Sequence, residues 1–145
     1  MEKATPIRFV ITKIEIENFK VAETVSENRD SIKLGTGGVF NFDTTNHVIA
    51  PSITFVYKND KEVLFELTAQ CSFMIEQVGW EAFKEPGKGT LIPVAFLQHL
   101  AFNAINTVRG IVFCKSEGTP FADYIIPMIN VENIVKENIL IPDAN

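Results

Sequence analysis

The chain has little of what metalloenzymes and nucleic-acid-binding proteins depend on. Its two cysteines, Cys71 and Cys114, lie far apart and lack the spacing of metal ligands. Its 13 basic residues form no cluster and are outnumbered by 18 acidic ones, which gives a net charge of −5. A protein that binds nucleic acid needs a basic face. We therefore expect no nucleic-acid partner and no bound metal.

Signals for export or membrane insertion are also missing. No apolar run approaches the roughly 20 residues that span a bilayer. The segment Met1–Pro6 lacks the charged region and the apolar core of a signal peptide. Two cysteines without disulfide spacing favour a reducing compartment. Because 145 residues is an ordinary length for one domain, we expect a single cytoplasmic domain over residues 1–145 that does not insert into membranes.

Catalytic patterns are weak. The segment Pro86–Thr90 contains glycine, lysine and threonine, as phosphate-binding loops do, but an extra glycine separates its lysine from its threonine. The two histidines, His47 and His99, are isolated and belong to no Ser-His-Asp or Cys-His arrangement. The sequence therefore predicts that the protein is not an enzyme, with no catalytic residues and no cofactor.

What the chain does have is apolar surface, since 46% of its residues are hydrophobic and 12 are phenylalanines. Four segments show the alternation of β-strands. The first, from Ile7 to Ile16, changes parity once, which predicts a bulge near Thr12–Lys13. A glycine turn at Gly35–Gly38 precedes a short strand at Val39–Thr44, and a third strand surrounds Ile53–Tyr57. The fourth and longest strand has apolar side chains at odd positions: Val63, Phe65, Leu67, Ala69, Cys71, Phe73 and Ile75.

The alternation also assigns the two faces of the sheet. Phe55, Phe65 and Leu67 are predicted to face the helices, and Glu66 and Gln70 to face outward. A three-residue hairpin loop would place Phe55 opposite Phe65 and so match apolar to apolar across the third and fourth strands.

The second half of the chain predicts a long helix. It begins at Pro93 and ends at Arg109, where Gly110 is the stop signal. Its apolar stripe is backed by a polar face without charge. This predicts that the face is an interface between subunits, formed by Gln98, His99, Asn103 and Asn106. The alternative is an ordinary amphipathic helix with a neutral outer face.

An apolar connection follows, and then one short helix. Pro120 and Pro127 interrupt regular structure in the connection. Apolar side chains on irregular backbone either anchor it to a core or line a binding groove. Together with aromatic residues that precede the long helix, they predict a groove for an apolar ligand, lined by Trp80, Phe83, Phe113, Phe121, Tyr124, Ile125 and Met128. The alternative is that Phe121 and Tyr124 anchor the connection to the sheet.

The order of these elements and their motifs carry a resemblance to a known family. Leu91-Ile-Pro93 opens the long helix, and Val108-Arg109-Gly110 closes it, with two proline-marked bends beyond. Phe42-Asp43-Thr44 ends the second strand, and Leu64-Phe65-Glu66-Leu67 lies on the fourth. In these features, over roughly Ile7 to Ile139, the chain resembles the SecB family of protein-export chaperones.

The resemblance implies a fold, a function and partners. It implies an α+β domain with a four-stranded antiparallel sheet and one long and one short helix on one face. It implies a homotetramer, built as a dimer of dimers, that holds unfolded polypeptides or preproteins in apolar grooves without ATP. In the family the outer sheet face docks the translocase motor SecA, and Leu64 and Glu66 match that region through the fourth-strand motif. The chain differs from the family in two places. Glu15 and Glu17 are offset from the positions of the family's acidic pair, and the tail, Ile141–Asn145, lacks the family's zinc-linked docking extension.

Two other functions stay open at this point. One is a SecB-like chaperone dedicated to a single client, such as the antitoxin of a toxin–antitoxin pair. The other is a small-ligand-binding or enzymatic α+β domain whose cleft is lined by the same aromatic residues. A deep closed pocket with converging polar groups would favour this last function, and an open groove would argue against it.

Overall fold

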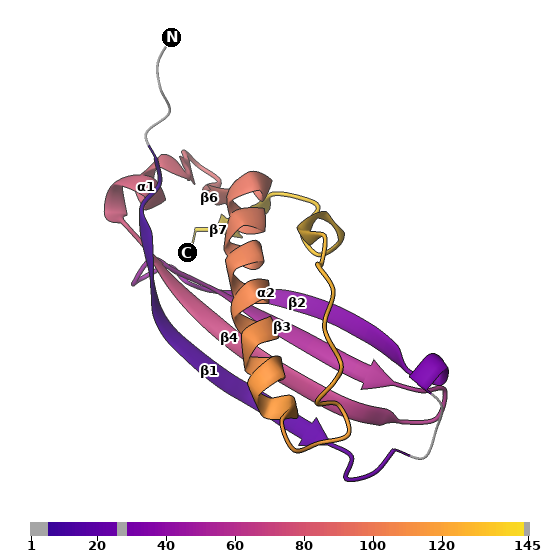
Figure 1. Cartoon of the computed structure of the whole chain (residues 1–145). Helices are drawn as coiled ribbons and strands as arrows, with labels where there is room; N and C mark the ends of the chain where they lie inside the picture. The colour runs from indigo at the N-terminus through magenta and orange to yellow at the C-terminus, as the bar shows by residue number, and fades with distance from the viewer. Residues whose placement is uncertain (1–5, 26–28, 144–145) are drawn as a thin grey trace.

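The computed structural model describes residues 6–25 and 29–143 (Figure 1). The first five residues, which belong to the segment predicted to lack a signal peptide, lie outside these ranges. The main sheet consists of β1 (Phe9–Val21), β2 (Lys33–Asp43), β3 (Val48–Lys58) and β4 (Val63–Ile75). The helices are α1 (Gln77–Ala82) and α2 (Val94–Ser116). A small second sheet contains β5 (Lys84–Glu85), β6 (Gly89–Ile92) and β7 (Ile139–Pro142), and 3₁₀ turns lie at Arg29–Ser31 and Val131–Asn133.

The fold class predicted from the sequence is confirmed. The four long strands are antiparallel in the order β1-β4-β3-β2, and α2 crosses one face of the sheet (Figure 1). The predicted faces are also confirmed, because Phe55, Phe65 and Leu67 are buried in the core between sheet and helix. Cys71 lies in the same buried row, where burial raises the pKa of its thiol, so it acts as a small core hydrophobe.

The β3–β4 hairpin has a different register from the one predicted. Phe55 pairs with Leu67 rather than with Phe65. The reason lies in Asn59, whose Oδ1 accepts hydrogen bonds from the backbone N–H groups of Lys61 at 2.9 Å and Glu62 at 2.8 Å and so stabilises a longer loop. The pairing of β3 with β4 is therefore shifted by two residues from the predicted register. A shift of two leaves every side chain on its predicted face.

The predicted glycine turn is part of strand β2 instead. Gly35–Gly38 pairs with β3 without interruption, in a register that runs from Lys33 to Asp43. A Cβ at Gly38 would lie 3.1 Å from Cγ2 of Ile134, a tight contact that the Ile134 side chain would have to relieve by shifting slightly. Pairing with a long partner strand therefore overrides the local preference of glycine for turns. The bulge predicted near Thr12 in β1 is confirmed, and a second bulge lies between Ile16 and Asn18.

The long helix does not end at Arg109 as predicted. It continues through Gly110 for two more turns to Ser116. Gly110 lies on the solvent side, where a side chain would meet open space, and Val112 beyond it is buried. Burying a valine side chain gains about 1.5–3 kcal/mol, whereas a glycine in a helix costs about 1 kcal/mol. The gain exceeds the cost, and the helix continues.

The short helix also lies elsewhere in the chain order. It is α1, which precedes α2 and sits at one end of the sheet (Figure 1). After the connection, where the short helix was expected, the chain forms the 3₁₀ turn Val131–Asn133 and then strand β7, which pairs with β6. The C-terminal segment thereby returns to the beginning of α2.

Candidate functional site: the end of helix α2 and the connection

The connection from Glu117 to Asn130 is held against the end of α2 by Arg109. Its Nη2 donates a hydrogen bond of 2.8 Å to the carbonyl oxygen of Ile126. Its Nη1 makes longer contacts, at 3.3 Å to Oδ1 of Asn106 and at 3.6 Å to Sδ of Met128. The residue predicted to close the helix therefore fixes the connection at its proline-marked bend.

An aromatic cluster fixes the first part of the connection to the sheet. Phe121 is fully buried, stacks on Tyr57 at 5.3 Å between ring centroids and contacts Phe65 at 5.5 Å. Tyr124 meets the rings of Tyr57 and Phe121 at 5.0 and 4.9 Å. Burial raises the pKa of the Tyr57 hydroxyl. This arrangement corresponds to the alternative in which Phe121 and Tyr124 anchor the connection.

Three of the predicted groove residues are strongly exposed on the same side of the molecule. The exposed fractions are 68% for Phe113, 81% for Ile125 and 71% for Met128. A hollow of 420 Å³ lies between the helix and the connection, and Phe113, Tyr124 and Ile125 line it together with Arg109. The structure therefore brings together four of the seven predicted residues. Phe113, Tyr124 and Ile125 line the hollow, and Met128 contacts Arg109 in its wall.

The remaining three predicted groove residues belong to the hydrophobic core. Trp80 and Phe83 are buried at the other end of the sheet, where Trp80 stacks on His47 at 5.1 Å and Phe83 contacts Phe96 at 5.4 Å. Phe121 is buried in the aromatic cluster. In this structure none of the three offers its ring to a ligand. Aromatic content indicates how much apolar area exists and does not distinguish core from surface.

The predicted subunit interface lies along the exposed side of α2. Gln98 donates through Nε2 to the carbonyl oxygen of Val135 at 3.0 Å, and Asn103 donates through Nδ2 to that of His99 at 2.8 Å. His99 and Asn106 are exposed. Phe102 is exposed by 43% and was not singled out from the sequence, although its spacing from Asn106 places both on one helical side.

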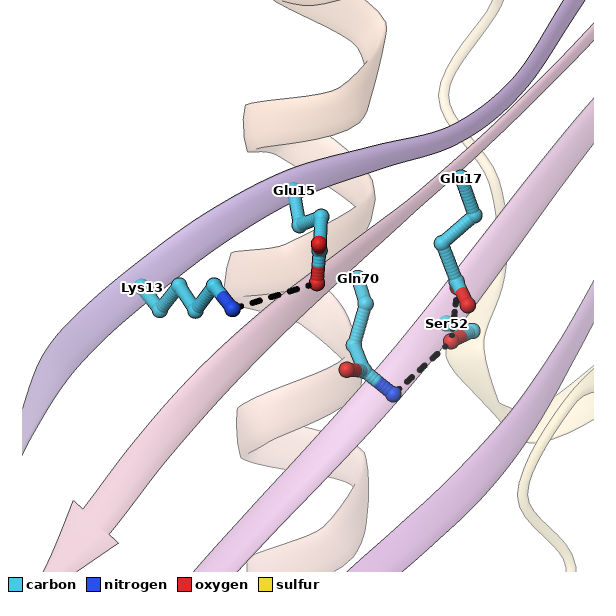
Figure 2. A network of polar contacts seen from close by, with 5 residues as sticks. All are labelled: Lys13, Glu15, Glu17, Ser52 and Gln70. Carbon is cyan, nitrogen blue, oxygen red and sulfur yellow. Dashed lines mark hydrogen bonds and ion pairs between the residues drawn. The ribbon is translucent and has the colours of Figure 1, made fainter.

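The opposite face of the sheet carries a network of polar side chains. Glu17 accepts a 2.6 Å hydrogen bond from the hydroxyl of Ser52, which in turn accepts one of 3.2 Å from Gln70, and Lys13 pairs with Glu15 at 3.4 Å (Figure 2). The bulge before Asn18 places Glu17 in this network.

The two residues that the resemblance assigned to SecA docking differ in accessibility. Glu66 lies on this outer face and is half-buried between Lys20 and Val56. Leu64 belongs to the hydrophobic core and is only 4% exposed. Of the two, Glu66 alone presents its side chain.

Metal and membrane sites can be addressed for the described ranges. Within them, no three His, Cys, Asp or Glu side chains come close enough together to hold a metal ion. The same ranges contain no helix with the length and apolar character needed to cross a membrane.

Comparison with known proteins places the fold. No protein-family model and no curated protein matches the sequence. Among solved structures, the chain is similar to a SecB-like chaperone from Mycobacterium tuberculosis, determined in complex with a ChAD peptide from the HigA1 antitoxin. The TM-score is 0.55 at 10% sequence identity, over 84% of this chain and 91% of that one. A protein of unknown function from Streptococcus agalactiae matches with a TM-score of 0.40 at 8% identity, over 87% of this chain and 100% of that one. The first similarity shows that this chain has a SecB-like fold.

Proposed function

We propose that the protein is a chaperone that binds non-native polypeptides without ATP. The observation that carries the proposal is the exposed apolar surface formed by Phe113, Ile125 and Met128 beside the hollow at the end of α2. A folded protein seldom leaves large apolar side chains together on its surface unless they bind something. Met and aliphatic side chains adapt to many partners, which suits a protein that recognises unfolded chains.

The similarity to a SecB-like chaperone supports this proposal. That protein was determined with a bound peptide, and the fold of the two chains is shared. By extension we propose a homotetramer in the cytoplasm, with the exposed side of α2 around Phe102 and Asn103 as the contact between subunits. For protein export we propose Glu66 as the side chain that meets SecA.

A dedicated client is the second candidate function. The observation that favours it is the peptide in the similar structure, which comes from an antitoxin. A toxin gene next to the gene of this protein would support a dedicated role, and a wide range of bound clients would support a general one.

The hollow offers little to a small-molecule enzyme. Arg109 is the one charged side chain among the described residues that line it. Specific small-molecule sites direct several polar groups at the ligand. We therefore place the chaperone proposal ahead of the enzymatic one.

The proposal is tested by the aggregation of heat-unfolding citrate synthase, followed by light scattering without nucleotide. We expect the wild-type protein at stoichiometric amounts to delay aggregation. Replacing Ile125 and Met128 together by serine removes exposed apolar area and is expected to shorten the delay by at least half while the melting temperature changes by less than about 2 °C, because surface substitutions usually cost less than about 0.5 kcal/mol.

Val78→Ser is the matched control, since Val78 is 65% exposed on α1, away from the connection. It is expected to leave the delay unchanged. Equal delays for all variants would remove Ile125 and Met128 from the binding surface. A wild-type protein that never delays aggregation would contradict the proposal as a whole.

A further inference from the structure

The hollow at the end of α2 contains a positive charge without an anionic partner. Arg109 is half-buried in its wall, and no carboxylate in the described ranges lies within ion-pair distance of it. Fully buried arginines in proteins are almost always paired, and burying part of a guanidinium carries part of the same desolvation cost. An unpaired guanidinium in this position therefore needs a reason.

The contact between Arg109 and the connection does not supply that reason. One short hydrogen bond, from Nη2 to Ile126, holds the connection, but a guanidinium has five N–H donors. The Nη1 contacts of 3.3 and 3.6 Å are longer than the 2.7–2.9 Å typical of charge-assisted hydrogen bonds, and the Nε group is buried with no partner. Arg109 therefore retains its charge for a ligand, and its Nη1 group retains donor capacity.

The rest of the hollow determines which ligand would meet this charge. Phe113, Tyr124 and Ile125 present apolar surface next to Arg109. The volume of 420 Å³ falls in the range of small-molecule sites, roughly 300–1,000 Å³, which is enough for one or two side chains. An apolar side chain can fill the space while a neighbouring carboxylate reaches the guanidinium.

We propose that this hollow selects client segments in which an aromatic or large aliphatic residue stands next to Asp or Glu. The inference rests on the proposed function and defines the substrate class of that same surface. Arg109 is a specificity-determining residue in this scheme. The side-chain carboxylate replaces Asn106 and Met128 as the partner of Nη1, and the apolar neighbour packs against Phe113 and Ile125.

The test uses three fluorescein-labelled peptides with amidated C-termini that differ in one residue. Each carries a central Phe followed by Asp, Asn or Lys in an otherwise uncharged sequence, and binding is measured by fluorescence anisotropy. We expect the Phe-Asp peptide to bind roughly three- to tenfold more tightly than the Phe-Asn peptide, which is the effect of a charged hydrogen bond discounted for partial exposure. The Phe-Lys peptide is expected to bind most weakly, and 0.5 M salt to reduce the differences.

Two variants locate the preference. Asn106→Asp is nearly isosteric and places a carboxylate where Nη1 now contacts the amide oxygen, so that Arg109 is neutralised within the protein. It is expected to bring the affinities for Phe-Asp and Phe-Asn within about twofold of each other, since twofold corresponds to less than half a kcal/mol. Arg109→Gln is expected to do the same. Asn41→Asp, on the exposed part of β2, is the charge-matched control and is expected to keep the preference.

The outcomes separate this inference from the proposed function. Equal affinities for Phe-Asp and Phe-Asn in the wild type, or a preference that persists in both variants, would overturn the acidic selectivity. Tight binding of a Phe-Asn peptide with a free C-terminal carboxylate, without a preference for Phe-Asp, would overturn recognition of internal segments. If no peptide binds and citrate synthase still aggregates at its own rate, the proposed function itself fails.

Discussion

Phe65 and Glu66 are neighbours in sequence and lie on opposite faces of β4. Phe65 is fully buried beneath α2 and in contact with Phe121, whereas Glu66 is half-buried on the polar face. We expect Phe65→Ala to lower the free energy of unfolding by about 3–5 kcal/mol, the usual cost of a phenylalanine truncated in a core. Urea denaturation measures this cost.

Glu66→Gln at the next position is the natural comparison. It removes a charge that makes no ion pair within the described ranges, and we expect a change below about 0.5 kcal/mol. If Glu66 meets SecA as proposed, the same variant weakens co-sedimentation with SecA. A Glu66 variant that unfolds at a much lower urea concentration would contradict the assignment of the two faces.

For single residues, the sequence predicted the position of a side chain reliably where one pattern was enough to determine it. Alternation placed Phe55, Phe65 and Leu67 inside because strand geometry allows only two directions for a side chain. It did not determine which residues of β3 and β4 face each other. That depended on Asn59, whose side chain stabilises a loop through its own hydrogen bonds.

Among the elements, α2 depends on a residue far from it in sequence. Its first N–H groups have no local side-chain cap, because Pro93 stands at the N-cap. The cap comes instead from Asn138, whose Oδ1 accepts a 2.7 Å hydrogen bond from the backbone N–H of Val94. We expect Asn138→Ala to cost about 0.5–2 kcal/mol, as other lost N-caps do, measured by thermal or urea unfolding.

Asn138→Asp provides the control. It keeps the acceptor oxygen and adds a negative charge near the positive end of the helix dipole, and we expect it to unfold no more easily than the wild type. Alanine and aspartate variants of identical stability would show that the hydrogen bond to Val94 contributes nothing.

The elements differ in how far local signals describe them. Gly110 is a good stop signal, and yet α2 passes through it because Val112 has a place in the core. Likewise Gly35–Gly38 lies inside β2 because β3 offers a continuous partner. Both predictions were wrong for one reason: a propensity of about 1 kcal/mol is smaller than the tertiary contacts that the segment can make.

For the whole molecule, the proposed association of subunits is the property most open to measurement. Asn103 is half-buried on the exposed side of α2, three residues from Asn106 and adjacent to Phe102. Asn103→Glu would place an unpaired charge in the proposed interface, and such charges weaken association strongly. We expect light scattering coupled to size exclusion to give four times the 16.2 kDa subunit mass for the wild type and a smaller multiple for the variant.

Gln77→Glu likewise replaces an amide by a carboxylate, on α1, where Gln77 is exposed, and is expected to leave the mass unaltered. A wild-type protein of 16.2 kDa in solution would remove the proposed interface. An Asn103 variant with unchanged mass would place the interface elsewhere.

The candidate site was the part least accessible from the sequence. The sequence identified the residues of the connection, because prolines and apolar side chains mark it. It did not show which of these residues are buried in the core and which are exposed. Phe121 and Ile125 look alike in the sequence, and one is buried while the other is exposed by 81%. That difference arises from Tyr57 and Arg109, which contact the connection from other elements.

The capping of α2 by Asn138 also has a consequence for synthesis on the ribosome. The two bonded residues are 44 positions apart, and β7, which follows Asn138 directly, pairs with β6 just before the helix. While the chain is being translated, the sheet strands emerge first and can pair, but the beginning of α2 stays without its cap until Asn138 has been made. The nascent protein therefore passes through a stage in which its apolar helix is present and incompletely fixed. At this stage a protein that we propose binds the unfolded chains of other proteins exposes an apolar segment of its own, and such exposed segments are prone to aggregation.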